Sequence, residues 1–220
     1  MLTVRTATPE DAAAIAAIRA GSWQSAYAGI IAADVLARFT SREAVDQRID
    51  AMRRNWPAGM LIAETPTAPS AEPGAGAVGA AEGGSESAWL GGAVGPGGAV
   101  GPGGAVGPWP VGFAHFGAER DPESRVPPPA DQGAARPRAE LYAIYVLPGY
   151  WSAGAGRALM AEVIGRTTAA GYPAITLWVL QENYRARRFY ERAGFTVTGQ
   201  SLVPDWLGGI AEVEYARELG

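Results

Sequence analysis

Apolar and polar residues alternate or recur in patterns that divide the first 65 residues into strands and helices. Residues 2–6 alternate and predict a short strand. The following TPED, residues 8–11, is a capping box with proline at the first helical position, so we expect a helix from residue 9 to about residue 23 or 27. Its inward-facing positions are expected to be Ala12, Ile15, Ile18 and Ala20.

A second capping box, TSRE at residues 40–43, predicts another helix that runs to about residue 54. The charged side chains that this helix should expose are Arg48, Asp50 and Arg53. GMLIAET at residues 59–65 then predicts a strand.

Strands and helices alternate through the rest of the chain. VGFAHFG (111–117), ELYAIYVL (140–147) and AITLWVL (174–180) have the composition of strands. Helices are expected over residues 156–170, with Gly171 as the stop, and from a cap at Asn183 to residue 193. Two final strands are expected at residues 195–200 and 211–217.

This order, β-α-α-β, an insert and then β-β-α-β-α-β-β, predicts one α+β domain over residues 1–220. The insert, about residues 66–110, is mostly alanine, glycine, proline and serine, which cannot bury enough apolar surface to offset the entropy of ordering. A second loose loop is expected at about residues 121–139. A long segment between two strands that a tight turn could join is either a lid or a disordered insertion.

Within the insert, residues 91–108 repeat one hexapeptide three times, GGAVGPGGAVGPGGAVGP. Glycine at every third position from Gly92 matches a collagen-like register, although a triple helix needs three chains and normally more triplets. An elastin-like flexible coil and an ordered lid are the alternatives. We interpret the repeat as an interruption of the domain, and we expect the function of the domain to lie in other residues.

Composition and charge narrow the chemistry. The 18 basic residues are all arginine, and the 22 acidic residues give a net charge of −4, which argues against nucleic acid as a main partner. The absence of lysine excludes Walker and Schiff-base lysines, and the absence of cysteine excludes disulfides and thiol nucleophiles. His115 is the only histidine, so a multi-histidine metal site is excluded and no metal is expected. A hydrolase triad has little support, because His115 has no plausible serine and acid partner.

Two features bear on location. The first residues, MLTVRTATPED, lack the apolar region of a signal peptide. Residues 87–117 carry no formal charge, but Pro96, Pro102 and Pro108 would each break a membrane-spanning helix. We therefore expect a soluble cytoplasmic protein with no membrane partner.

The stretch YVLPGYWSAGAGRALM, residues 145–160, is the strongest candidate for chemistry. Gly154 and Gly156 let the backbone approach a ligand, and the N-terminus of the following helix offers unpaired N–H groups to a pyrophosphate. The glycines could also serve only a tight turn. A dinucleotide-binding fingerprint is a weaker alternative, because the third glycine is missing and Glu182 comes late for a ribose-binding acid.

The same stretch resembles the acetyl-CoA signature of the GCN5-related N-acetyltransferase (GNAT) superfamily, in which a strand ending V-x-P is followed by [QR]-x-x-G-x-[GA] and a helix. Downstream, NYRARRFYERAGF (183–195) matches the family's N-x-x-A-x-x-F-Y-x-x-x-G-F segment at every fixed position. RTATPEDAAAIAAI near the N-terminus and the GFAHFG strand are also similar. Trp151 departs from the family, which usually has glutamine or arginine there.

The resemblance implies an α+β fold with a mixed, mostly antiparallel central sheet flanked by helices. The strands at 140–147 and 174–180 would be the splayed parallel pair that holds acetyl-CoA, with its pantetheine bonded to the backbone near Tyr145 and Val146. The residues expected to surround the pyrophosphate are Trp151, Ser152, Ala153, Gly154, Ala155, Gly156 and Arg157. Arg157 could equally be a solvated helix residue.

By the same resemblance the reaction is direct acetyl transfer from acetyl-CoA to a primary amine through a tetrahedral intermediate. Tyr190 occupies the family's general-acid position, and a phenol is a proton donor at neutral pH. Glu140 is the candidate general base, with water or His115 as alternatives. A backbone N–H near Val146 would stabilise the oxyanion. Asn183 either bonds the cofactor or only caps its helix.

The acceptor is the least defined part. Trp23, Tyr27, Asp205 and Trp206 are the candidates for its pocket, which would be partly aromatic with one carboxylate. They do not choose between a small-molecule amine and a peptide amine, and a homodimer stays open. A non-catalytic acyl-CoA-binding or sensor module is the alternative function.

Overall fold

The computed structural model describes residues 1–66, 108–121 and 138–220, so the hexapeptide repeat and most of both low-complexity segments lie outside the described residues. The N-terminal elements are β1 (Thr3–Thr6), the 3₁₀ turn η1 (Pro9–Asp11), α1 (Ala12–Ala26), α2 (Ala33–Thr40), α3 (Arg42–Arg54) and β2 (Met60–Thr65). After the insert come β3 (Trp109–Ala118), β4 (Ala139–Val146), η2 (Pro148–Tyr150), α5 (Ala155–Ala169), β5 (Ala174–Leu180), α6 (Tyr184–Arg192), β6 (Thr196–Leu202), η3 (Asp205–Leu207) and β7 (Glu212–Glu218).

The strands form one sheet in the order β1-β2-β3-β4-β5-β7-β6. Every neighbouring pair is antiparallel except β4 and β5, which run parallel in the middle of the sheet. The expected fold class is therefore confirmed, including the parallel pair inside a mostly antiparallel sheet.

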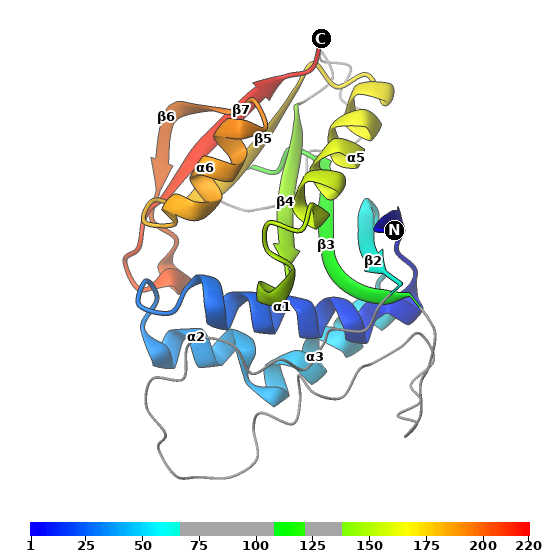
Figure 1. The fold of residues 1–220 in the computed structure, drawn as a ribbon. Helices are drawn as coiled ribbons and strands as arrows, with labels where there is room; N and C mark the ends of the chain where they lie inside the picture. The colour runs from blue at the N-terminus through cyan, green and yellow to red at the C-terminus, as the bar shows by residue number, and fades with distance from the viewer. Residues whose placement is uncertain (67–107, 122–137) are drawn as a thin grey trace.

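Helices cover both faces of the sheet (Figure 1). On one face, Ile15 and Ile18 of α1 pack with Ile62 and Phe113 of the sheet. On the other face, the apolar sides of α5 and α6 pack against a larger cluster that includes Leu159, Val163, Ile175, Leu177 and Tyr190. The four positions of α1 that the sequence predicts to face inward are all buried.

Between α1 and α3 the structure differs from the sequence prediction. The TSRE capping box was wrong: Thr40 is the last residue of α2, a short amphipathic helix that the sequence reading missed, and its hydroxyl donates to the Leu36 carbonyl. Ser41 caps α3 instead, accepting a hydrogen bond from the Ala44 N–H at 3.3 Å. Two polar residues in a row allow either to be the cap, and sequence alone does not choose between them.

β3 begins two residues earlier than expected, so Trp109 and Pro110 belong to the sheet and not to the insert. Pro110 lies opposite Glu64, where the register between β2 and β3 shifts. A β-bulge is one of the few places where a strand tolerates proline, because the ladder is already interrupted there.

A second register shift lies at the centre of the sheet. His115 pairs with Ala143 and Phe116 pairs with Leu141, so Tyr142 is an extra residue in β4. A bulge of this kind bends its strand and turns the following side chains to the opposite faces. Among the described residues, β4 pairs with β5 only through Ala139 with Ile175 and Glu140 with Thr176, immediately before the bulge. Beyond it the two strands diverge toward α1 (Figure 1).

The bulged residue is held by its surroundings. The Tyr142 hydroxyl donates to the Ala118 carbonyl, and its ring packs edge-on against His115 and under the Arg120 guanidinium at 4.2 Å. A Cβ on Gly117 would lie 2.6 Å from the Tyr142 hydroxyl. Glycine at 117 therefore makes room for the tyrosine that fills the bulge.

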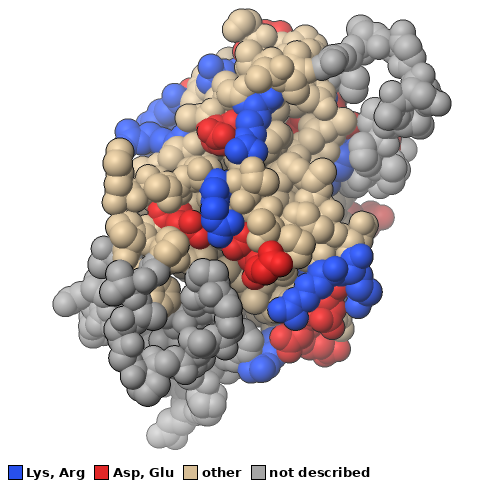
Figure 2. Space-filling view, turned by 90° about the vertical axis from the view of Figure 1, so that its right-hand side faces the viewer, with Lys and Arg blue, Asp and Glu red and all other residues tan. Residues whose placement is uncertain are grey.

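Buried ion pairs tie the N-terminal strand to the rest of the sheet. Arg5 of β1 bonds both Asp11 and Glu64 at 2.7 Å, and both carboxylates are buried. Burial alone would raise the pKa of Asp11, but the bonds from Arg5 and the Thr8 N–H lower it below its usual value. On the face of the molecule drawn in Figure 2, basic and acidic side chains of the described residues are intermingled.

Candidate functional site

The gap between β4 and β5 opens into a cleft of about 1500 Å³, the main cleft, which is lined by residues from both faces of the sheet. Its walls include α1, the second half of β4, the loop before α5, and α6. Residues predicted from two separate motifs, around Gly154 and around Tyr190, are therefore brought to one site.

The backbone of β4 offers unpaired donors to this gap. The Leu147 N–H bonds the Val111 carbonyl at 2.9 Å, which fixes residues 145 and 147 as the ones whose backbone groups face β3. Because backbone groups alternate along a strand, those of Ile144 and Val146 face the opened side. Tyr145 contributes its side chain to the main cleft, whereas the sequence reading missed Ile144.

The Val146 carbonyl is already bonded. Ser22 of α1 donates to it at 3.1 Å and the Trp151 indole N–H donates to it at 2.8 Å. Trp151, which departs from the family pattern, thus fastens the end of β4 to the loop before α5. The guanidinium of Arg185 stacks on the Trp151 ring at 4.0 Å, which places a positive charge beside this loop.

The start of α5 has the geometry of an anion site. Gly154 precedes the helix with φ of +98°, a conformation that favours glycine, and Ser152 also has a positive φ of 67°. The first helical bond runs from the Ala158 N–H to the Gly154 carbonyl, which leaves the preceding N–H groups without helical partners. A Cβ on Gly156 would lie 3.4 Å from Phe189, an ordinary van der Waals contact, so packing between α5 and α6 does not itself require glycine there.

Three tyrosine side chains meet where the main cleft crosses the sheet. Tyr190 of α6 is buried, and its pKa is raised first by burial and then by the nearby Tyr145. Burial and Tyr145 also raise the pKa of Tyr27. Tyr190 and Tyr27 therefore carry their protons at neutral pH, and Tyr190 is suited to donate one.

Glu140 and His115 line the same cleft on the face covered by α1 and α3. Arg120 holds both oxygens of the buried Glu140, with its backbone N–H at 2.9 Å and its guanidinium at 3.1 and 2.5 Å. Burial, followed by the charge of Arg120, lowers the pKa of His115 to about 4. His115 is thus neutral at pH 7.

Asn183 is the N-cap of α6: its side-chain oxygen accepts the Ala186 N–H at 3.1 Å. The residue also lines the main cleft. The capping role is therefore present, and the side-chain NH₂ group is left for other partners.

The acceptor candidates divide into two groups. Trp23, Tyr27 and Trp206 line the main cleft, and the Trp23 ring packs edge-on against Tyr27 at 5.1 Å and parallel to Trp206 at 6.4 Å. Asp205 is exposed and lies outside the cleft lining. The acid that does line this part of the cleft is Glu212, at the start of β7.

Sequence reasoning missed several residues of the cleft, which are Arg19, Ser22, Arg48, Arg120, Ile144 and Glu212. Three of them, Arg19, Ser22 and Arg48, lie in helices, where charged or small residues are typical of ordinary surface positions. Arg120 lies just after β3 and gave no signal of its pairing with Glu140, 20 residues away.

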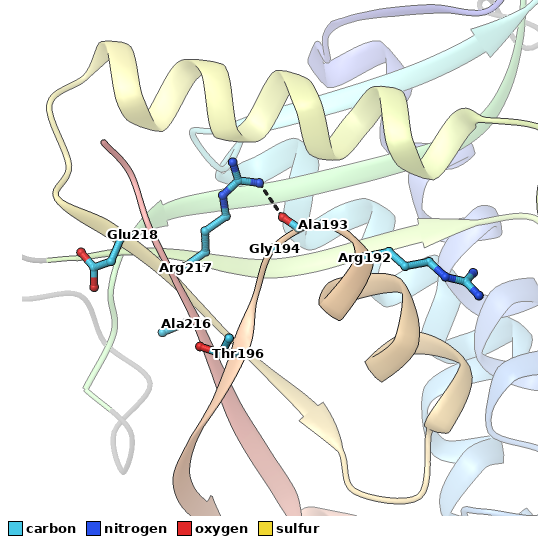
Figure 3. Close-up of a pocket in the computed structure, with 7 residues that line it drawn as sticks. All are labelled: Arg192, Ala193, Gly194, Thr196, Ala216, Arg217 and Glu218. Carbon is cyan, nitrogen blue, oxygen red and sulfur yellow. Dashed lines mark hydrogen bonds between the residues drawn. The ribbon is translucent and has the colours of Figure 1, made fainter.

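A smaller hollow of about 620 Å³ lies between the end of α6 and β7 (Figure 3). Arg217 donates to the Ala193 carbonyl at 2.5 Å, and Arg192 points away from it (Figure 3). A cation that bonds the last carbonyls of a helix stabilises its C-terminus. We therefore assign Arg217 a structural role.

Residues 1–66, 108–121 and 138–220, which the structure describes, contain neither a membrane-spanning helix nor a cluster of metal ligands. None of their helices has the length and apolar character needed to cross a membrane. Nor do they contain a group of three or more histidine and carboxylate side chains placed to hold a metal ion.

Comparisons with known proteins agree with this site. The model of the acetyltransferase (GNAT) family matches residues 99–195. An uncharacterized N-acetyltransferase of Mycobacterium bovis is 47% identical over 84 residues, which cover 36% of this chain and 51% of the relative. Mycothiol acetyltransferase of Frankia alni is 35% identical over 115 residues, which cover 47% of this chain and 33% of that protein. The alignments thus span about half or less of these curated relatives.

Solved structures show the same fold at low identity. YncA of Salmonella typhimurium, solved with acetyl-CoA, has a TM-score of 0.57 and 19% identity over 100% of this chain and 94% of its own. PaiA N-acetyltransferase of Thermoplasma acidophilum, solved with coenzyme A, has a TM-score of 0.53 and 19% identity, and the match covers 97% and 98% of the two chains. The chain is therefore similar to the GNAT family over residues 99–195, and its described residues have the GNAT fold.

The lowered pKa of His115 predicts a specific loss of stability in mild acid. The unfolded chain binds a proton near pH 6.5 and the folded chain only near pH 4, so the free energy of unfolding falls as the pH drops through this window. Between pH 7.5 and pH 5 the loss from His115 should be about 2 kcal/mol. Denaturant unfolding of wild type and His115→Gln at both pH values measures it.

The variant should lose less stability than wild type over that pH interval, whatever its stability at pH 7.5. Because His115 is the only histidine, no other imidazole contributes. Equal losses in the two proteins would show that His115 titrates normally in the folded state.

Proposed function

We propose that this protein is an N-acetyltransferase that moves an acetyl group from acetyl-CoA to a primary amine. The observation that carries the proposal is the half-open β4–β5 pair, with backbone donors facing the opening, directly beside the free N-terminus of α5. The similarity of residues 99–195 to the GNAT family and the CoA-bound solved neighbours support it.

The residues present fit acetyl-CoA. The backbone N–H and carbonyl of Ile144, which face the gap, can bond an extended pantetheine arm as an added strand would. The N–H groups at the start of α5 suit the pyrophosphate, and both glycines keep side chains out of its way. Arg185, held on Trp151, supplies a charge where the family usually has a polar side chain at position 151 itself.

When bound, acetyl-CoA supplies the thioester and its thiolate leaving group. The Val146 N–H, which faces the gap, would bond the acyl oxygen, and such a donor stabilises negative charge that develops there. Tyr190 donates its phenolic proton to the departing sulfur. Its raised pKa keeps that proton in place at neutral pH.

The amine must lose a proton to attack. Glu140 lies four residues before Ile144, roughly 13 Å along the strand, so it reaches the reacting amine only through water. Arg120 holds its carboxylate in place by bonding both oxygens. We propose that a water carries the proton from the amine to Glu140. His115, which is neutral at pH 7, lines the same cleft.

Two measurements on the wild-type protein test the proposal. Acetyl-CoA at 100 times its Kd should raise the free energy of unfolding by about 2.7 kcal/mol, because it binds only the folded state. NAD should cause no shift. A panel of primary amines should then include at least one that accelerates release of the CoA thiol.

Stabilisation by NAD and none by acetyl-CoA would contradict the assignment of the glycine loop. Stabilisation by acetyl-CoA without thiol release for any amine would instead identify a non-catalytic acyl-CoA-binding module.

The Tyr190→Phe variant tests the general acid. It keeps the ring and its packing and removes only the proton donor, so folding and acetyl-CoA affinity should change little. Turnover should fall by about 10²- to 10⁴-fold, the usual contribution of general acid–base catalysis. Steady-state turnover on an identified amine is the measurement.

Tyr184→Phe is the matched control, because Tyr184 lies on the same helix, is exposed and is outside the main cleft. Near-wild-type turnover of both variants would remove Tyr190 from the mechanism.

A further inference from the structure

Two arginines that the proposed reaction does not use line the acceptor side of the main cleft. Arg19 comes from α1 and Arg48 from α3, the two helices that cover the face of the sheet opposite α5. We call them the cation pair. Burial lowers the pKa of both arginines, and the positive charge of Arg48 also lowers the pKa of Arg19.

The cation pair has no acidic partner among the residues that the structure describes. Two other arginines near the sheet bond carboxylates: Arg5 bonds Asp11 and Glu64, and Arg120 bonds Glu140. Arg19 instead stacks its guanidinium on the Trp23 ring at 4.1 Å. Stacking satisfies the flat face of a guanidinium and leaves its N–H edge available.

Leaving this pair without a counter-ion is unfavourable. Burial lowers the pKa of Arg19 to about 10, and the like charge of Arg48 lowers it further. Burial also lowers the pKa of Arg48. Both side chains line one cleft, Arg19 half-buried and Arg48 exposed, and an anion bound there would stabilise both positive charges.

The same wall holds another unpaired donor. The indole N–H of Trp23 is the one buried side-chain N or O atom without a hydrogen-bond partner in the described part of the chain. Buried indole donors normally find an acceptor. Donors thus exceed acceptors on this side of the cleft.

The cation pair is close to the reaction centre. The electrostatic effect of Tyr145 raises the pKa of both arginines, and that of Tyr27 raises the pKa of Arg19. Tyr145 also acts on the pKa of Tyr190, the proposed acid. The charge of Glu212, which also lines the main cleft, raises the pKa of Tyr27.

We propose that the acceptor is a small molecule that carries both a primary amine and a carboxylate, such as an α-amino acid, and that Arg19 and Arg48 bind the carboxylate. This inference rests on the proposed function and narrows its acceptor. Arg19 stacks on Trp23, whose ring packs against Tyr27, so the carboxylate and the amine of one small acceptor would bind in the same part of the cleft. A polyamine carries only positive charge, and the cation pair would repel it.

The test compares acceptors that differ only in the carboxylate. Each of a set of α-amino acids is assayed beside its α-carboxamide and the amine without the carboxyl group, in wild type, Arg19→Met and Arg48→Met. At least one amino acid should exceed its amide in kcat/KM by 10²-fold or more, since its carboxylate bonds two guanidinium groups. Each substitution should remove most of that advantage and leave acetyl-CoA affinity unchanged.

Arg38→Met is the matched control, because Arg38 is exposed, pairs with Asp34 on α2 and is outside the main cleft. Arg48→Lys, which keeps the charge, covers the case in which a methionine variant fails to fold, and should retain part of the preference. The melting temperature of each acetyl-CoA-saturated protein is also followed with amino acids and their amides.

Amides or simple amines that match the amino acids as acceptors, with no effect of either substitution, would overturn the inference and leave the proposed function standing. So would the absence of both acetylation and a melting shift for every amino acid. A loss of acetyl-CoA affinity in the arginine variants would assign the cation pair to the cofactor instead. Failure of wild type to bind acetyl-CoA would contradict the proposed function itself.

Discussion

The bulge at Tyr142 is the constraint on which the site depends. Parallel strands in the middle of a sheet would normally pair along their length and leave no room for a ligand. Here the pairing of β4 with β5 ends at Glu140, just before the extra residue. The backbone groups of Ile144 and Val146 beyond it face the gap between the two strands. Tyr142 can occupy the bulge because Gly117 leaves space beneath its ring.

The opened sheet separates two chemical environments. The face under α5 and α6 offers the helix N-terminus and Arg185, which suit phosphates. The face under α1 and α3 offers aromatic rings, Glu140 and the cation pair, which suit an acceptor. The gap joins the two faces, and Tyr190 lies there. In the proposed reaction the thioester and the amine would approach this gap from opposite faces.

The bulge also explains what the sequence could and could not predict. Every strand was found within two residues, and the glycine loop and Asn183 cap were correctly placed, because strand composition, glycine and cap residues act locally. ELYAIYVL gives no sign that Leu141 and Ile144 face the same side, since an unbroken strand would put them on opposite faces. The helix α2 was missed because eight residues hold too little periodicity to stand out.

Candidate residues that depend on distant contacts were the hardest to predict. Trp23, Tyr27 and Trp206 were found from their aromatic character, whereas the exposed Asp205 was chosen and Glu212 overlooked. The pairing of Glu140 with Arg120, and the lack of any such acidic partner for Arg19 among the described residues, are properties of tertiary structure. An unpaired charge cannot be recognised until the positions of all neighbouring charges are known.

Amide hydrogen exchange along β4, with and without acetyl-CoA, tests the central claim most directly. In the free protein the N–H groups of Tyr145 and Leu147, which face β3, should be protected, and those of Ile144 and Val146, which face the gap, should exchange fast. Acetyl-CoA should protect Ile144 and Val146 and change their neighbours little. Exchange at Ile144 and Val146 that acetyl-CoA leaves unaltered would contradict the claim that the opening between β4 and β5 is the acyl-CoA site.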